Sequence, residues 1–186
     1  MGDGAVPEAS WSLAKTERET RDLIDQTGPE ALQVDDLVIG DLPHIAWSGT
    51  PSHLRNVEGQ LTRAAGGEVE YLAVRAPGGA PVAKGGIDYT LHEGAGTMFQ
   101  LATLPSLQGL GIARRLISVA EDRIRKRGLS VAMLGVEVDN DRARSIYERL
   151  GYSVCGHEED SWETEDEQGN THTRHAQIAL LKKHLV

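Results

Sequence analysis

The residue pattern with the clearest chemical meaning is a glycine loop within residues 101–113 (LATLPSLQGLGIA). An apolar, strand-like run ends at Pro105, and residues 108–111 (Gln-Gly-Leu-Gly) then lead into an amphipathic helix. Two glycines allow the backbone to approach a ligand closely, and the free N–H groups at a helix N-terminus favour an anion there. The segment therefore predicts a cradle for a pyrophosphate group.

Two other nucleotide-binding loops use glycines in a similar way, and the spacing disfavours both. The dinucleotide-binding βαβ fingerprint needs a third glycine or alanine where this chain has Arg114, and its strand runs into the loop without a proline. The P-loop needs Gly-Lys-Ser or Gly-Lys-Thr, which the sequence lacks. The loop therefore favours a different class of phosphate cradle.

A second motif follows downstream, in residues 136–152 (VEVDNDRARSIYERLGY). Together with the strand end Leu101–Pro105 and the loop after it, this motif resembles the GNAT superfamily of N-acetyltransferases. That signature joins a Leu-x-Val-x-Pro strand end to a Gln/Arg-x-x-Gly-x-Gly/Ala loop, and Thr103 here replaces the usual Val. The resemblance covers about residues 97–155 and implies an α/β fold with a mixed, mostly antiparallel central sheet flanked by helices.

The resemblance implies acetyl-CoA as cosubstrate. The strand-end backbone is expected to bind the pantetheine arm, the loop N–H groups the pyrophosphate, and Asn140 the arm from the other side. The implied cofactor-binding residues are Ala102, Thr103, Leu104, Gln108, Gly109, Leu110, Gly111, Ile112, Ala113 and Asn140. Polyanionic CoA gives Arg114 and Arg115 an electrostatic reason to lie nearby, although a solvated helix face explains them equally well.

The implied reaction is direct transfer of the acetyl group to a primary amine of an unidentified small molecule or peptide. Such an amine has a pKa of about 10.4, so it must lose a proton before it attacks, and the departing thiolate must gain one. Tyr147 occupies the family's Tyr position and is the expected general acid. A core tyrosine with a satisfied hydroxyl is the alternative.

The general base is where the sequence departs from the family pattern. Many members carry a Glu early in the strand before the loop, but residues 97–100 read Thr-Met-Phe-Gln. Glu137 and, after it, Asp88 are the predicted substitutes, acting directly or through water. Both are also compatible with ordinary surface positions on strands. The missing carboxylate leaves a noncatalytic acyl-CoA-binding regulatory module as an alternative function.

An acidic segment is expected to border the acceptor side. Seven acidic residues lie within residues 158–167, with Trp162 among them. A cationic amine would be attracted by these carboxylates and could rest on the indole face. A solvated hairpin loop with Trp162 folded onto the sheet explains the same residues.

The elements that position these residues follow from hydrophobic periodicity and turn signals. We expect helices over 15–25, 54–65, 108–127 and 140–150, strands over 37–39, 70–75, 82–91, 97–104, 131–138, 152–155 and 175–181, and a loop over 158–170. The strand over 131–138 is predicted to be buried on both faces. Residues 1–30 are predicted to be a tail or appended helix, and residues 31–186 a single N-acetyltransferase domain.

Composition narrows the class of protein. The 186 residues carry 19 Lys and Arg against 28 Asp and Glu, and this net charge of -9 disfavours binding to a nucleic-acid backbone. No apolar run approaches the roughly 20 residues that span a bilayer, and no secretory signal opens the chain, so we expect a cytoplasmic protein without a membrane partner. One cysteine and scattered histidines predict neither an internal disulfide nor a metal site. A homodimer is compatible with the sequence.

Overall fold

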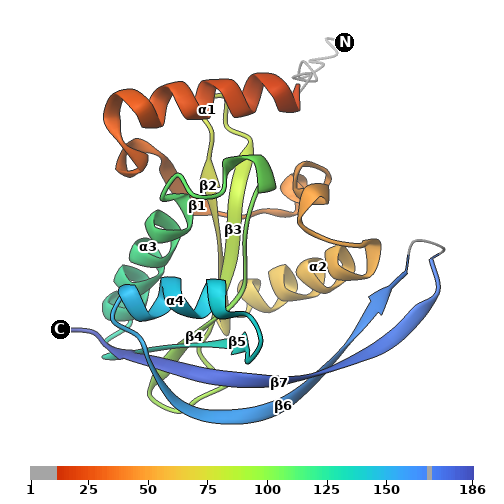
Figure 1. Cartoon of the computed structure of the whole chain (residues 1–186), viewed down its shortest axis with the longest axis vertical. Helices are drawn as coiled ribbons and strands as arrows, with labels where there is room; N and C mark the ends of the chain where they lie inside the picture. Colours follow the sequence, from red (N-terminus) through yellow and green to blue (C-terminus); the bar gives the residue numbers. More distant parts are fainter. Residues whose placement is uncertain (1–11, 167–168) are drawn as a thin grey trace, which may run out of the picture.

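The computed structural model describes residues 12–166 and 169–186, and within them seven strands form one sheet in the order β1-β2-β3-β4-β5-β7-β6 (Figure 1). The strands are β1 (Gln33–Asp36), β2 (Val69–Arg75), β3 (Pro81–Asp88), β4 (Ala95–Thr103), β5 (Val131–Glu137), β6 (Ser153–Glu165) and β7 (Thr171–His184). The helices are α1 (Leu13–Thr27), α2 (Pro51–Ala65), α3 (Ile112–Lys126) and α4 (Asp141–Arg149), and the 3₁₀ segments are η1 (Pro29–Ala31), η2 (Ile39–Ser48) and η3 (Pro105–Leu107).

The sheet is mixed. Every neighbouring pair is antiparallel except β4 and β5, which run parallel. Parallel neighbours need a long connection, and α3 supplies it, whereas β2, β3 and β4 follow one another through the short Gly/Pro turns that the sequence predicts. The predicted fold class, a mixed and mostly antiparallel sheet flanked by helices, is confirmed.

Helices cover both faces of the sheet, as Figure 1 shows for α3 and α2. Successive residues of β2 point to opposite faces, and Tyr71 packs in the apolar cluster below α2, whereas Leu72 packs in the larger cluster below α3. The buried side chains of α3 recur at helical spacing, from Ile112 to Ile124, and therefore form one apolar stripe against the sheet.

The centre of the sheet is irregular around β4. Its pairing with β5 ends at Met98, opposite Leu134, although both strands continue beyond that point. On its other edge β4 carries a bulge, in which Gln100 and Leu101 together oppose Gly85. A Cβ atom on Gly85 would lie 2.4 Å from Leu101 Cδ2, so the bulged side chain packs there only because residue 85 is glycine. Gln100 itself has a φ of 51°.

Three sequence-based predictions about strands are wrong. The first strand is β1 rather than residues 37–39, because Leu37 turns into the cluster below α2 and the chain then continues as η2. In β5 only Ala132, Leu134 and Val136 are buried, so one face and not both is covered.

The third wrong prediction is the acidic loop. Residues 158–165 belong to β6, which pairs with β7 as far as Glu165 opposite Thr171. This part of the hairpin lies largely exposed, and the strand therefore lacks the apolar alternation by which sequence reasoning recognises strands.

The helix predicted over 15–25 is α1, and it packs on the segment that follows β4. Arg21 donates a hydrogen bond to the backbone carbonyl of Ser106, and Ser106 Oγ donates to Glu17 at 2.6 Å. The division of the chain near residue 30 stays a prediction. None of the helices within residues 12–166 and 169–186 has the length and apolar character needed to cross a membrane.

Candidate active site

The glycine loop that the sequence predicts to be a cradle lies at the start of α3. Gly109 and Gly111 have φ angles of 84° and 83°, a region that other residues rarely adopt. A Cβ atom on Gly109 would meet no atom within 4 Å, so open space lies above this backbone. The first N–H groups of α3 have no acceptor within a preceding helical turn, which makes this end of the helix suited to an anion.

A cavity of about 750 Å³ lies along this loop, between the end of β4, the start of α3 and α4. Eight of the ten predicted cofactor-binding residues line it, namely Ala102, Thr103, Gln108, Gly109, Gly111, Ile112, Ala113 and Asn140. Asn140 also caps α4, because its Oδ1 accepts a hydrogen bond from the N–H of Ala143 at 3.1 Å.

The other two predicted cofactor-binding residues are turned away from this cavity. Leu104 is buried, and its N–H donates to the carbonyl of Val82 at 2.9 Å, so that this donor is already used within the sheet. Leu110 packs against the core cluster below α3. Neither residue is among those that line the cavity.

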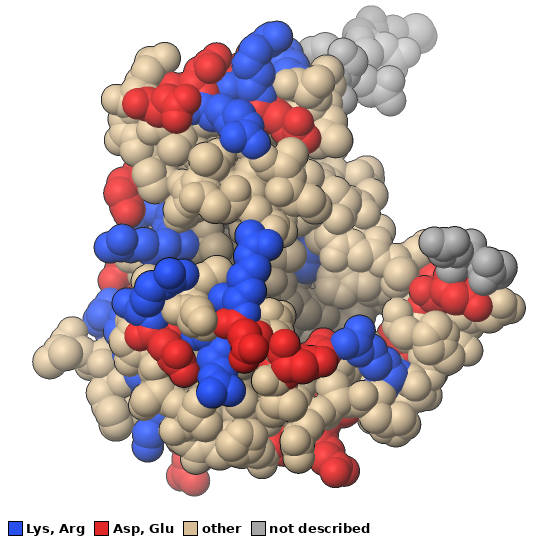
Figure 2. All heavy atoms as spheres, viewed as in Figure 1, with Lys and Arg blue, Asp and Glu red and all other residues tan. Residues whose placement is uncertain are grey.

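Basic side chains line the same cavity. Arg114, Arg142 and Arg149 border it, and within the part of the chain that the structure describes none of the three forms an ion pair. Arg115 instead points away and pairs with Glu30 at 3.5 Å. Figure 2 shows Lys and Arg side chains gathered on the side of the molecule where α3 and α4 lie, next to a hollow in this face. The cavity therefore combines a helix N-terminus with three available cations.

A second cavity, of about 1170 Å³, lies between α2, the β4–β5 region and the β6–β7 hairpin. The residues that line both cavities are Ser48, Leu101, Asn140, Ala143 and Tyr147. Tyr147, the predicted general acid, thus stands where the two cavities meet. Burial raises the pKa of its phenol, which keeps the hydroxyl protonated at neutral pH.

A family model describes this arrangement. Residues 41–152, more than half of the chain, match the model of the acetyltransferase (GNAT) family. This chain belongs to the GNAT family. The family resemblance predicted from the loop and from residues 136–152 is thereby confirmed.

Individual relatives of this GNAT chain match over shorter stretches. Mycothiol acetyltransferase of Streptomyces avermitilis is 40% identical over 69 residues, which are 37% of this chain and 22% of that protein. N-alpha-acetyltransferase 30 of Schizosaccharomyces pombe is 38% identical over 65 residues, or 33% of this chain and 43% of that protein. The matches thus span less than half the length of either relative.

Solved GNAT structures share the fold across most of the chain. Spermidine N-acetyltransferase from Vibrio cholerae, in complex with CoA and spermine, has a TM-score of 0.61 at 19% identity and covers 82% of this chain and 95% of that one. The ribosomal-protein-S18-alanine N-acetyltransferase from Escherichia coli has a TM-score of 0.58 at 18% identity, and the match covers 83% of this chain and 94% of that one. At these identities the likeness concerns the fold.

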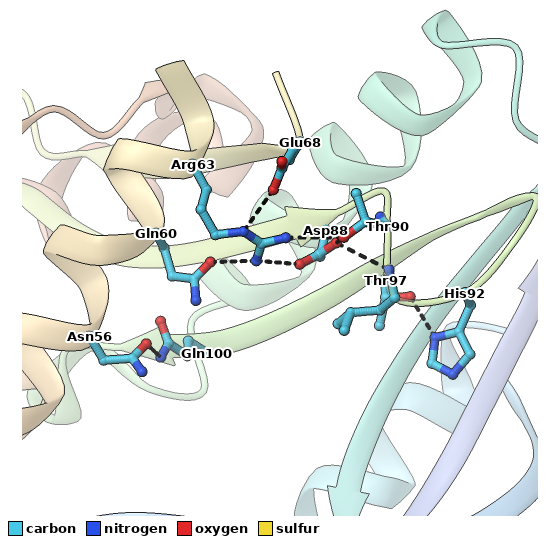
Figure 3. A network of polar contacts seen from close by, with 10 residues as sticks. Asn56, Gln60, Arg63, Glu68, Asp88, Thr90, His92, Thr97 and Gln100 are labelled. Atoms are coloured by element: carbon cyan, nitrogen blue, oxygen red, sulfur yellow. Dashed lines mark hydrogen bonds and ion pairs between the residues drawn. The ribbon is translucent and has the colours of Figure 1, made fainter. Parts of the chain in front are cut away.

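Neither predicted carboxylate base of this GNAT chain is free. Glu137 lines the second cavity, but its carboxylate pairs with Arg174. Asp88 lies outside that cavity, within the network of Figure 3, where Arg63 donates to it at 2.6 Å and both the N–H and the hydroxyl of Thr90 donate as well. These bonds, set against the cost of burial, hold the pKa of Asp88 below its usual value. Asp88 is not among the residues that line the second cavity, and its role as a substitute base stays a prediction.

The acidic residues of β6 do border the second cavity. Glu158, Asp160 and Glu163 line it, and within the described residues none of them has a cationic partner. Trp162 lines it too, but the guanidinium of Arg174 already lies over its ring at 5.4 Å from the centroid. Its indole face is therefore partly used by the chain itself.

Two groups of residues near the cavities were not predicted from the sequence. Arg142 and Arg149 lie seven positions apart on α4, a spacing that places them on one helix face and could have indicated a shared anion.

The other missed group is Lys84 with His53. Burial lowers the pKa of Lys84 to about 7 and that of His53 to about 4, the latter also because of the nearby lysine. In the sequence, the feature that could have indicated this buried pair is a single lysine among the small and apolar residues of β3.

Proposed function

We propose that this chain is an N-acetyltransferase that moves the acetyl group of acetyl-CoA to a primary amine. The observation that carries the proposal is the junction of two cavities at Tyr147. One cavity has the features of a site for a polyanionic cosubstrate, and the other is bordered by carboxylates. A phenol that can supply a proton stands between them.

The first cavity fits acetyl-CoA by its chemistry. The backbone at Gly109, with open space in front of it, and the N-terminus of α3 suit the pyrophosphate. Arg114, Arg142 and Arg149 suit the remaining phosphate charge. The backbone of Ala102 and Thr103, on the part of β4 that β5 does not cover, suits the pantetheine amides. Bound there, acetyl-CoA would supply an activated thioester.

Tyr147 is the proposed general acid toward the departing thiolate. Its hydroxyl forms no hydrogen bond with any described residue, although the ring packs edge to face on Tyr152 at 6.4 Å between centroids. An oriented ring with an unused O–H donor is what a proton donor at the cavity junction requires. Glu137, held by Arg174, is better suited to shaping the acceptor wall than to accepting a proton.

The acceptor that suits the second cavity is an amine with further positive charge. Glu158 and Asp160 line this cavity and share one face of β6 because they lie two positions apart, and a cationic amine would pair with them without displacing a residue of the chain. Among proteins of the same fold, one structure holds spermine. A polyamine is therefore a sensible first acceptor to test.

The test is release of the CoA thiol from acetyl-CoA in the presence of a panel of amines. The panel contains spermidine, spermine, an aminoglycoside, free amino acids and peptides with free N-termini. We expect release with at least one cationic amine and a weaker response when Glu158 and Asp160 are both changed to Gln. CoA-dependent thermal stabilisation without release for every amine would instead favour an acyl-CoA-binding regulatory module.

A further inference from the structure

A buried lysine lies on the central strand β3, near the second cavity, which is the proposed acceptor cavity. Lys84 is fully buried, and its Nζ lies within hydrogen-bond distance of three groups. These are Nε2 of His53 at 3.1 Å, the hydroxyl of Tyr71 at 3.0 Å and the backbone carbonyl of Gln100 at 3.3 Å. No carboxylate pairs with it within the described residues, so nothing neutralises its charge when it is protonated.

The donors and acceptors of the hydrogen bonds around Lys84 can be assigned. The Tyr71 hydroxyl donates to the side-chain oxygen of Gln100 at 2.9 Å, and the Gln100 amide donates to Asn56 at 2.8 Å, a contact visible in Figure 3. Both Tyr71 and the Gln100 carbonyl are thus left to accept from Lys84. The bulge of β4 is what turns the Gln100 carbonyl toward the lysine side of the strand.

His53 connects this buried lysine to the cavity. It lies in the first turn of α2 and lines the acceptor cavity, while its Nε2 faces Lys84. The second ring nitrogen, Nδ1, forms no hydrogen bond with a described residue. Histidine passes a proton from one ring nitrogen to the other by exchanging tautomers, which suits a residue placed between a cavity and a buried base.

We propose that His53 and Lys84 together accept the proton that the acceptor ammonium must lose, with His53 as the catalytic residue and Lys84 as the positioning residue behind it. The proposal rests on the acetyl transfer proposed above. The ammonium gives a proton to His53 Nδ1, and His53 gives its Nε2 proton to the neutral amine of Lys84. The imidazole therefore stays neutral throughout, and the charge ends on Lys84.

The protons of the whole transfer balance. The acceptor ammonium starts with three N–H bonds, of which one goes to the His53–Lys84 pair and one remains in the amide. The third replaces the proton that Tyr147 gives to the CoA thiolate as the C–N bond forms and the C–S bond breaks. The lysine then returns its proton to solvent through His53, so each turnover releases one proton.

Within the described chain, the other charged groups that line the cavity do not interact with His53 or Lys84. Arg55 of α2 pairs with Glu165 of β6 at 2.8 Å, and Glu137 of β5 pairs with Arg174 of β7. The remaining carboxylates that line the cavity stand on β6, and among the described residues none of them forms a hydrogen bond or ion pair with His53 or Lys84. The pKa values of about 7 and about 4 place the mobile proton on Lys84 rather than on His53.

The first experiment measures the tautomer of His53 by nitrogen NMR on the whole chain labelled at histidine. Below the midpoint of Lys84 the ammonium donates to Nε2, so the ring proton lies on Nδ1; above the midpoint the ring proton lies on Nε2. We expect this exchange near neutral pH in the wild type and its loss in Lys84→Met. A single tautomer between about pH 5.5 and 9 in the wild type overturns the proposal.

The second experiment measures kcat as a function of pH with acetyl-CoA and the best amine of the panel. In the wild type kcat should rise through about pH 7, and Lys84→Met should lower kcat by roughly 10²-fold or more and remove that rise. The matched control is Lys183→Met, which removes a lysine of β7 that pairs with Glu121 of α3 and does not contact His53 through a hydrogen bond. It should keep the wild-type pH profile. An unchanged profile in Lys84→Met overturns the proposal.

The two experiments separate this proposal from the proposed function. If no amine supports thiol release, acetyl transfer to these acceptors fails, and the tautomer measurement alone decides whether His53 and Lys84 exchange a proton. If release occurs and Lys84→Met keeps both the rate and the pH profile, acetyl transfer stands, and another group accepts the proton.

Discussion

Tyr147 and Tyr152 pack edge to face, 6.4 Å apart between ring centroids, yet their hydroxyl groups differ in surroundings. The Tyr152 hydroxyl is buried and donates to Glu121 at 2.9 Å, whereas the Tyr147 ring borders both cavities and its hydroxyl has no partner among the described residues. The pair therefore offers a proposed catalytic phenol and a structural one side by side.

Tyr147→Phe is expected to lower kcat for thiol release by about tenfold or more, because the thiolate then leaves without a proton donor. CoA affinity should change little, since the ring remains. Tyr152→Phe is the matched control: it should cost about 1–2 kcal/mol of unfolding free energy and leave kcat near the wild-type value. Equal turnover in Tyr147→Phe and the wild type would remove Tyr147 from the mechanism.

Gly109→Leu is expected to abolish CoA binding, measured as loss of the thermal stabilisation that CoA confers. The added side chain would enter the open space above the loop, and the φ of 84° adds backbone strain. Gly94→Leu separates the two effects, because Gly94 has a φ of 74°, equally open surroundings, and is not among the residues that line either cavity. That variant should lose stability and still respond to CoA; a failure of both variants to respond would indicate general damage.

Changing Arg142 or Arg149 to Gln should weaken CoA binding by about 1 kcal/mol each, or roughly fivefold in Kd. Both side chains line the proposed CoA cavity without an ion-pair partner among the described residues. The loss should shrink at high salt because exposed charges are screened. Arg144→Gln serves as control, since Arg144 lies on the same helix but pairs with Glu148 at 3.3 Å. An effect of equal size there would argue against specific phosphate contacts.

Lys84→Met is expected to stabilise the fold in a pH-dependent way. The lysine pKa is about 7 in the fold against 10.5 as the ordinary value, so between these pH values the unfolded chain binds more protons. Wild-type stability therefore rises with pH across this window, and the full cost of the buried ammonium is present below it. In urea unfolding, the free energy of unfolding of Lys84→Met should exceed that of the wild type by roughly 1–4 kcal/mol below about pH 7. The difference should decrease toward pH 10.5. A gap that does not change with pH would mean that Lys84 keeps its ordinary pKa.

Local sequence was enough to predict the glycine turn and the two helices α3 and α4 beside it. Residues 105–113 carry the proline stop and the two glycines, the apolar stripe of α3 begins at Ile112, and Asn140 stands directly before the helix that it caps. Each of these features depends on neighbours a few positions away, which is the range over which turn and capping preferences act.

The second cavity depends on contacts between distant residues, and the sequence did not indicate those contacts. Lys84 meets His53 across 31 positions and the bulged Gln100 across 16, and neither spacing carries a local signal. The strand character of residues 158–165 comes from pairing with β7 rather than from an apolar pattern. Glu137 looked free in the sequence because its partner, Arg174, lies 37 positions away.

The two cavities have only the residues at their junction in common. A molecule bound in one cavity leaves most of the other cavity open. Acetyl-CoA and the amine should therefore bind at the same time, and no product has to leave before the second substrate binds. Double-reciprocal plots of initial velocity against both substrates should then intersect rather than run parallel. Cys155 is exposed and borders neither cavity, so the chain offers no thiol there to carry the acetyl group between two half-reactions.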